Sequence, residues 1–326
     1  MASSFQTRLT ELFKIEHPIL CGGLMWLADA NYVGAVVNAG AMGFITPRSF
    51  PDLAAFREQL QKCKAITGGR PFGVNLYISG QPKHNDLVES WIETSLEEGV
   101  RHFETAGFSP AKWLPRLKDE GAVVVHKCTT IRHALRAERD GVDAISLVGY
   151  ECGGHPGMNN LSATTLGAHG AESLSIPFVI GGGIGTGGQL AGALSLGASG
   201  VLMGSRMLVS EEIWAHEDYK KHLLTLDASS TTTVLSTFKN TYRCLNNEAA
   251  KEVAALEARG VSDFEAYQEL VRGEEARKVY ETGDWSYGIL SLGPAIAFAD
   301  TIEPASNIIE RIIQEATQAT QHVGDL

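Results

Sequence analysis

Short runs of apolar, often β-branched residues recur along the chain up to residue 206, and stretches with helical periodicity separate them. Apolar runs without strict alternation are typical of strands that are buried on both faces of a parallel sheet. The repeated order of strand and helix therefore predicts an α/β fold. The eight predicted strands span 17–24, 41–47, 71–78, 100–107, 122–129, 142–149, 177–183 and 199–206.

Eight strand–helix units favour a closed (β/α)8 TIM barrel, with an open doubly wound sheet as the alternative. Helical patterns fall between the strands, for example at 51–64, 130–140 and 186–196. Such a barrel needs about 250 residues. The 326 residues of the chain therefore leave enough length for an additional subdomain.

Beyond residue 206 the strand pattern gives way to helical periodicity. The last helical stretch carries an apolar stripe that predicts packing against the barrel as its eighth helix. We expect a barrel from 1–206 plus 300–326 and a small helical cap, the substrate subdomain, from 207–299. The helical stretches are 247–259, 262–280 and 304–322, and the stripe consists of Ile308, Ile309, Ile312, Ile313, Ala316 and Ala319.

Charge and cysteine content narrow the function classes. The formal net charge is -11 and no Lys/Arg-rich run occurs, so nucleic acid is not an expected partner. The chain has neither an 18-residue apolar stretch nor the apolar core of a secretory signal, which favours a cytoplasmic protein with no membrane partner.

The five cysteines of the chain are scattered without a CxxC motif, so we expect reduced thiols and no metal site. Cys21, Cys128 and Cys152 are interpreted as small buried apolar residues.

Glycines close the seventh and eighth strands at the end where parallel strands bind ligands. Gly181, Gly182 and Gly183 end one strand, and Gly204 and Ser205 end the next. The helix that opens near Thr186 would add unpaired N–H groups and its dipole. Loops after strands 7 and 8 of a barrel commonly bind phosphate, so these residues predict a phosphate site. The alternative is that the glycines only form tight turns.

His155 lies in the glycine-rich segment Cys152-Gly153-Gly154-His155-Pro156-Gly157, which follows the sixth strand. Glycines allow the backbone to approach a ligand closely. His155 is therefore a candidate general base or hydrogen-bond donor to an anionic substrate, although a lone histidine is often structural. Glu151 could orient the imidazole or be a solvated carboxylate.

Two polar residues interrupt apolar strands. Strand alternation sends Lys127 to the face opposite His126 and Cys128, where it could stabilise an anionic ligand group, form a Schiff base, or pair with Glu104. Asn75 lies within the third strand, where an amide needs a ligand or a polar neighbour. The segment Gly22-Gly23-Leu24 closes the first strand and also permits close backbone approach.

The ordered motifs HPILCGG, FGVN, VHKCT, ECGGHPG, PFVIGGGI and VLMGSR resemble those of the FMN-dependent nitronate monooxygenase (2-nitropropane dioxygenase) family. They are especially similar to the bacterial branch that includes NADH:quinone reductases. The resemblance covers the whole chain and implies a TIM barrel with non-covalent FMN under a helical cap. The residue after the histidine is Pro156, whereas nitronate oxidases typically carry a polar or basic residue there, so the substrate stays open.

The resemblance also implies individual roles. Lys127 and Asn75 would contact the isoalloxazine ring, Gly153 would approach it, and His155 matches the active-site histidine of the family. The flavin would be lined by Gly22, Gly23 and Leu24, and its phosphate held by Gly181, Gly182, Gly183, Gly204 and Ser205.

The leading hypothesis is oxidation of alkyl nitronates with O2 to a carbonyl compound and nitrite. The alternative is NAD(P)H:quinone reduction, with NADH or NADPH as electron donor on the same flavin. A flavin-free Schiff-base lyase or isomerase that uses Lys127, and a non-catalytic flavin-binding protein, are the remaining rivals. The expected partners are a small-molecule substrate, nitronate or quinone, and O2, and a homo-oligomer is an open option.

Overall fold

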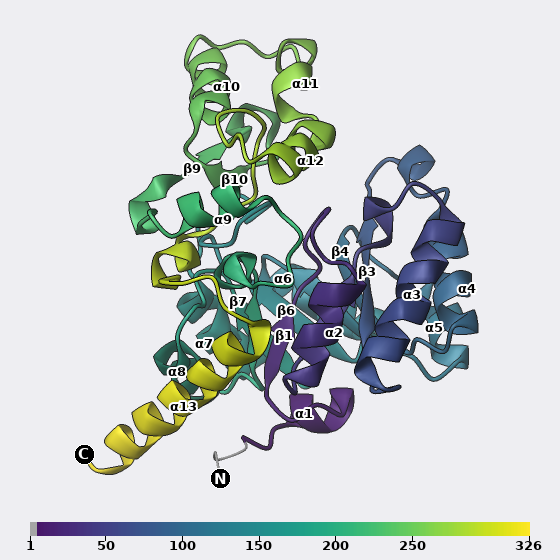
Figure 1. Cartoon of the computed structure of the whole chain (residues 1–326). Coiled ribbons are helices and arrows are strands. Elements are labelled where there is room, and N and C mark those ends of the chain that lie inside the picture. Colours follow the sequence, from purple (N-terminus) through teal and green to yellow (C-terminus); the bar gives the residue numbers. More distant parts are fainter. Residues whose placement is uncertain (1–4) are drawn as a thin grey trace.

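The computed structural model describes residues 5–326, which form a closed barrel of eight parallel strands inside a ring of helices (Figure 1). Each strand pairs with the next one along the chain, and β1 pairs with β8. The predicted TIM barrel is confirmed, and the open sheet is excluded because the ring has no unpaired edge. The strands are β1 (Ile19–Cys21), β2 (Met42–Ile45), β3 (Gly73–Ile78), β4 (His102–Gly107), β5 (Val123–Cys128), β6 (Ala144–Val148), β7 (Phe178–Gly181) and β8 (Val201–Met203).

One helix follows each strand on the outside of the barrel. The last helix, α13 (Ala305–Gly324), packs beside α8 and α2, which confirms that it completes the ring. A short helix, α1 (Arg8–Phe13), covers the amino-terminal end of the barrel, where Leu9 and Phe13 join the interior cluster. The other helices of the ring are α2 (Ala30–Asn38), α3 (Leu53–Thr67), α4 (Val88–Glu97), α5 (Leu114–Asp119), α6 (Ile131–Asp140), α7 (Ala163–Ser173) and α8 (Gly187–Ser195).

Alternation along each strand divides the core into two parts. On β5, Val125 belongs to the cluster that fills the barrel, whereas Val124 and Cys128 belong to the cluster between strands and helices. Successive side chains of a strand point to opposite faces. Lys127 therefore faces the barrel interior and His126 faces the helices, as the sequence predicts.

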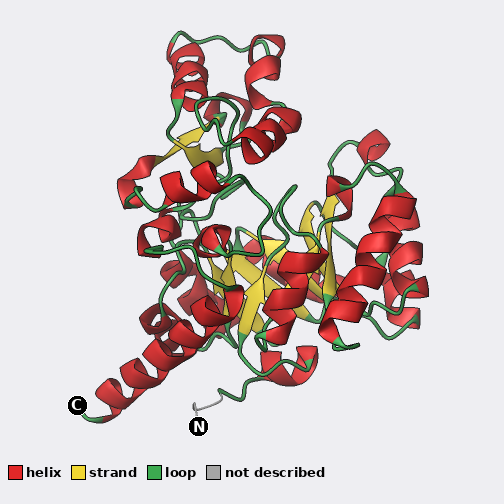
Figure 2. Cartoon of the chain, in the orientation of Figure 1, coloured by secondary structure: helices red, strands yellow, loops and turns green. Residues whose placement is uncertain are grey.

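The segment 207–299 lies above the carboxyl end of the barrel and has a small hydrophobic cluster of its own (Figure 1). The segment carries helices, as expected of a small helical cap, and in addition two strands that pair as an antiparallel hairpin, which the sequence does not predict (Figure 2). The prediction of a single helix at 262–280 is wrong, because the extended backbone of Arg272 divides this range into two helices. The elements are α9 (Glu217–Leu223), β9 (Thr231–Val234), β10 (Tyr242–Leu245), α10 (Glu248–Ala258), α11 (Glu265–Val271) and α12 (Gly273–Thr282).

All five cysteines are free thiols; Cys21 and Cys128 are buried, as expected of small apolar residues, whereas Cys152 is only partly buried. Burial raises the pKa of the Cys128 thiol to about 12. Within residues 5–326, no group of three or more His, Cys, Asp or Glu side chains is placed to hold a metal ion. No helix in this range combines the length and the apolar character needed to cross a membrane.

Candidate active site

A buried carboxylate meets a lysine at the carboxyl end of the barrel interior. Glu104 on β4 is 0% exposed, and its Oε2 lies 2.9 Å from Nζ of Lys127 on β5. The same oxygen accepts a hydrogen bond from Nδ2 of Asn75 on β3 at 2.5 Å and one from the backbone N–H of Gly23 at 2.9 Å. The ion pair with Glu104, one of the roles considered for Lys127, is therefore present. The Lys127 side chain is 22% exposed, so its ammonium can still contact a ligand.

His126, the neighbour of Lys127, faces away from the barrel interior and takes no part in the site. Its ring lies on the outer face of the barrel, where Nδ1 is 2.8 Å from the hydroxyl of Thr105. Burial lowers its pKa to about 4, so the imidazole is neutral near pH 7. His126 therefore belongs to the packing between strand and helix.

The polar side chains around the segment after β1 leave room only for glycine at positions 22 and 23. A Cβ on Gly23 would lie 2.4 Å from Cβ of Asn75, and one on Gly22 would lie 3.0 Å from Nζ of Lys127. Any larger residue would push Asn75 or Lys127 out of place. Leu24 follows and lies beside Gly204 of the β8 loop. Gly22, Gly23 and Leu24 are thus brought next to Asn75 and Lys127.

Three buried polar atoms around this centre have no hydrogen-bond partner in the part of the chain that the structure describes. They are Oε1 of Glu104, Oγ1 of Thr46 and Oγ of Ser146. Thr46 Oγ1 is next to Gly23, and Ser146 is the cross-strand neighbour of Lys127. Because buried polar groups are almost always paired, three of the ten unpaired ones among residues 5–326 gathered around one centre are consistent with a place where a ligand would supply the partners.

Two of the predicted phosphate residues have a packing or backbone reason to be glycine: a Cβ on Gly181 would lie 2.9 Å from Leu202, and Gly182 has a φ of +98°. The backbone N–H groups of Gly182, Gly183 and Gly204 have no acceptor among residues 5–326. The donors of Gly183 and Gly204 follow adjacent strands and fit an anionic group.

Ser205 is held beside them by the chain that returns from 207–299. Its hydroxyl accepts a hydrogen bond from the backbone N–H of Gly293 at 2.8 Å. A serine hydroxyl that accepts one bond can still donate its own hydrogen. Ser205 can therefore add a third donor to those of Gly183 and Gly204.

Of the first three N–H groups of α8, only that of Gly188 lacks an acceptor among residues 5–326, so the unpaired donors expected here are largely satisfied within the protein. Thr186 and Gln189 form a capping box, and Gln189 also accepts from the backbone N–H of Gly185. The carboxylate of Glu315, on α13, accepts from the N–H of Gly187 at 2.7 Å. This helix terminus therefore already holds an anionic group of the protein, which satisfies the Gly187 donor and interacts favourably with the helix dipole.

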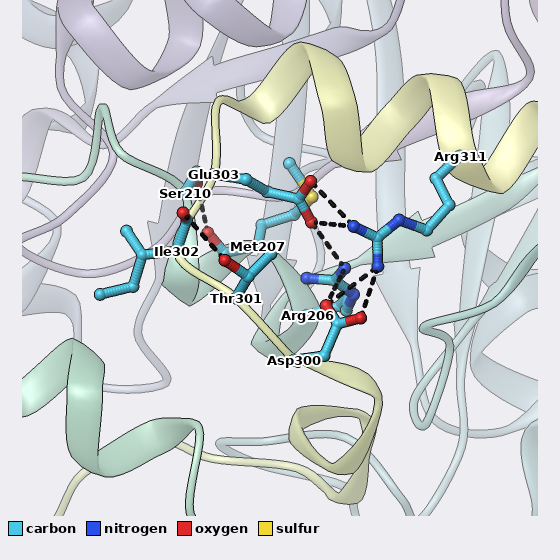
Figure 3. A network of polar contacts seen from close by, with 8 residues as sticks. All are labelled: Arg206, Met207, Ser210, Asp300, Thr301, Ile302, Glu303 and Arg311. Atoms are coloured by element: carbon cyan, nitrogen blue, oxygen red, sulfur yellow. Dashed lines mark hydrogen bonds and ion pairs between the residues drawn. The ribbon is translucent and has the colours of Figure 1, made fainter.

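A network of ion pairs with a buried centre, Arg206 and Glu303, anchors the loop after β8. Arg206 follows Ser205, is 2% exposed, and its Nη2 lies 3.2 Å from Oε1 of Glu303. Arg311 on α13 contacts both oxygens of Glu303 and both of Asp300 (Figure 3). The two guanidinium groups thus share the Glu303 carboxylate, and they tie the loop after β8 to the last helix.

His155 lies in the loop after β6, at the rim of the barrel, where this loop meets the hairpin. Its ring stacks edge-on against Tyr242 of β10, with ring centres 4.7 Å apart and planes at 90°. The residue is exposed, yet the protein that surrounds the ring desolvates it and lowers its pKa from the ordinary value. The imidazole is therefore neutral near pH 7 and has one nitrogen free to accept a proton.

The rest of this loop is fixed by the hairpin and the returning chain. Gly154 and Arg243 exchange two backbone hydrogen bonds, at 2.9 and 2.6 Å. Gly153 packs against the backbone of Leu292 and Gly293, where a Cβ would lie 2.9 Å from the nearest nitrogen. Glu151 does not orient His155, because its carboxylate accepts from the N–H of Ala163 at the start of α7.

Three residues of the site were not singled out from the sequence. Glu104 was considered only as a partner of Lys127, although its place in the predicted strand 100–107 is as unusual as that of Asn75. Tyr242 and Arg243 lie in a segment expected to be helical. The sequence Tyr-Arg-Cys-Leu alternates and contains an aromatic residue, which is a weak strand pattern that could have located them.

The fold and the site together define a class: an α/β barrel with a candidate ligand site at the carboxyl ends of its strands. The sequence model of the nitronate monooxygenase family matches residues 6–315. The chain belongs to this family, and it is a flavin-dependent oxidoreductase that acts on a small-molecule substrate.

Individual relatives carry several activities. A protein of Mycobacterium tuberculosis named (3aS,4S,5R,7aS)-5-hydroxy-7a-methyl-1-oxo-octahydro-1H-indene-4-carboxyl-CoA dehydrogenase is 34% identical and matches 78% of this chain and 70% of its own length. A probable nitronate monooxygenase of Staphylococcus aureus is 25% identical over 97% of this chain and 99% of that protein. The structure of FabK from Thermotoga maritima matches 99% of each chain at 28% identity, with a TM-score of 0.90.

Proposed function

We propose that the chain binds FMN non-covalently and oxidises alkyl nitronates with O2 to a carbonyl compound and nitrite. The unpaired donors of Gly183 and Gly204 and the hydroxyl of Ser205 suit a terminal phosphate. Asn75 and Lys127 would contact the isoalloxazine ring, which Gly22, Gly23 and Leu24 would line, and Gly153 would approach it. The bound flavin supplies the redox chemistry, because it accepts electrons from a donor and passes them to O2.

His155 carries this proposal, because it combines an exposed position with a lowered pKa. A neutral imidazole can donate an N–H to a nitronate oxygen, and where the neutral nitroalkane binds instead it can first take the proton from the carbon next to the nitro group. Edge-on contact with Tyr242 restricts the orientation of the ring. The segment 207–299 acts in this proposal as the substrate subdomain, since its hairpin contacts the loop of His155 directly.

NAD(P)H:quinone reduction is the second candidate. The dehydrogenase relative of M. tuberculosis favours a reductive or dehydrogenating activity, as does Pro156 after the active-site histidine. A Schiff-base lyase is disfavoured because Nζ of Lys127 is engaged by the carboxylate of Glu104 at 2.9 Å and is therefore not free to attack a carbonyl.

An anaerobic spectrum of the purified protein distinguishes these candidates. We expect an alkyl nitronate to bleach the flavin absorbance, which O2 then restores with release of nitrite. Bleaching by NADH or NADPH, without any response to nitronate, would reject nitronate oxidation and support the quinone reductase.

The phosphate assignment predicts that Gly204→Asp loses FMN. A Cβ at this position meets only Cδ2 of Leu24, at 4.0 Å, so an aspartate fits while its charge repels the phosphate. Like charges brought together cost several kcal/mol, so we expect FMN to bind at least about 100-fold more weakly than in the uncharged, equally large Gly204→Asn. Absorbance of bound flavin per protein measures the difference, with circular dichroism to verify folding. A full complement of FMN in the aspartate variant would reject the assignment. Gly183 is a poorer position for this test, because its φ of +74° would strain any side chain.

The assignment of Lys127 predicts that Lys127→Met lowers the reduction potential of the flavin. Reduced flavin carries negative charge and would lose a charge-assisted hydrogen bond, worth about 1–3 kcal/mol. Titration against a reference dye measures the shift. An unchanged potential would mean that Lys127 does not contact the ring, and mass addition at Lys127 after borohydride with a carbonyl substrate would identify a Schiff base.

A further inference from the structure

We propose that Glu104 is a positioning residue for the flavin: it orients Asn75, holds Lys127, and offsets the lysine charge so that the reduction potential stays low. The inference depends on the flavin-binding part of the proposed function. It does not depend on whether a nitronate or a nicotinamide donates the electrons.

Glu104 is placed to act on both ligand-facing side chains at once. Its Oε2 accepts from Nζ of Lys127 and from Nδ2 of Asn75, while the carboxylate itself has no exposed surface. Its other oxygen, Oε1, has no partner among residues 5–326 and lies 3.1 Å from the place of a Cβ on Gly22. A buried carboxylate with an unpaired oxygen is costly, so a purely structural role gives no reason to retain it here.

The contact between Glu104 and Asn75 determines which end of the amide faces the ligand. Because Nδ2 donates to the carboxylate, Oδ1 points elsewhere, and it has no hydrogen-bond partner in the described chain. Asn75 therefore presents an acceptor while Lys127 presents donors. This pair complements a ring edge with an N–H next to a carbonyl, which is the pattern of the flavin pyrimidine ring.

The ion pair also sets the local charge. An ammonium alone beside the ring would favour the negatively charged reduced flavin and raise the potential. Glu104 lies 2.9 Å from that ammonium and away from solvent, where charges are weakly screened. The pair is neutral as a unit, so the carboxylate cancels much of the effect of the lysine on the potential.

The test is the midpoint potential of the FMN-loaded Glu104→Gln protein, measured by equilibrium with a reference dye. Glutamine keeps the size and one acceptor but removes the charge. We expect the equilibrium constant for two-electron reduction to rise about tenfold, which corresponds to about 30 mV. Glu104→Asp, which restores the charge, should return the constant towards the wild-type value. A potential that is unchanged or lower in the glutamine variant would overturn the proposal.

A double variant covers the case in which Glu104→Gln fails to fold. Glu104→Gln with Lys127→Met removes both charges together and leaves no unpaired buried ion. We expect its reduction equilibrium to lie near that of the wild type, whereas Lys127→Met alone lowers it. Equal values for the double variant and Lys127→Met would show that the carboxylate charge has no effect, and would reject the inference.

A surface control accounts for the change in net charge. Glu93→Gln removes one negative charge from the exposed ion pair with Arg116 on the outside of the barrel, and should leave the potential unchanged. A shift as large as that of Glu104→Gln would reject a local effect. If the wild-type protein itself binds no flavin, the proposed function fails first, so the two failures are distinguishable.

Discussion

His155→Ala is expected to lower the turnover number by about 10²–10⁴-fold while the protein stays folded and keeps its flavin, because a positioned general base contributes a factor of this size. The ring lies on the rim, in contact with Tyr242 but outside both core clusters of the barrel. Its removal therefore leaves packing and cofactor contacts in place. Steady-state kinetics with each active donor, together with the flavin content, measure the effect.

The matched control is His169→Ala. His169 is exposed on α7, outside the site, and its replacement should leave the turnover number unchanged. Loss of flavin or of folded protein in His155→Ala would indicate a structural role for His155. Unchanged kinetics with every donor would remove it from the site.

The lowered pKa of His155 predicts a pH profile with a definite sign. With a neutral nitroalkane as substrate the neutral imidazole acts as the base, so kcat/KM should fall as the pH drops below the ordinary range of a histidine, where the ring becomes protonated. This acidic limb should be absent in His155→Ala. The ionisation of the substrate is measured separately, and a limb that persists in the variant would assign it to another group.

The strands of the barrel could be predicted because a short local stretch of sequence is enough to identify each of them. Each runs between buried neighbours on both faces, and glycine follows several of them, so a short apolar run bounded by glycine indicates a strand. The same alternation placed Lys127 inside the barrel and His126 outside it. For this part of the fold, no knowledge of distant contacts was needed.

The errors arose where distant residues decide the structure. The Gly187 donor at the start of α8 is satisfied by Glu315, 128 positions further along the chain, which no local pattern reveals. Strand β9 reads Thr-Thr-Thr-Val and gains its pairing from β10 across a turn. The convergence of Asn75, Glu104 and Lys127 depends on the register of three strands, so their individual positions could be predicted but not their shared carboxylate oxygen.

The second large effect that we expect is on stability: Glu303→Ala should lower the free energy of unfolding by about 3–5 kcal/mol, because it leaves the charge of Arg206 buried and unpaired. Arg206 is 2% exposed, and its remaining acidic neighbour, Asp300, is 4.0 Å away and 65% exposed. Since Arg206 directly follows Ser205, FMN binding should weaken as well.

Two comparison variants make this prediction specific to the buried pair. Asp300→Ala removes an exposed partner and should cost less than about 1 kcal/mol. Replacing Arg206 by Met and Glu303 by Leu together should cost less than Glu303→Ala alone, because apolar residues of similar size leave no unpaired charge. Urea unfolding followed by circular dichroism gives all three values. If Glu303→Ala is no more destabilising than Asp300→Ala, the network does not anchor the β8 loop, and the Gly204 and Ser205 donors must be held in place by Gly293 and the barrel strands instead.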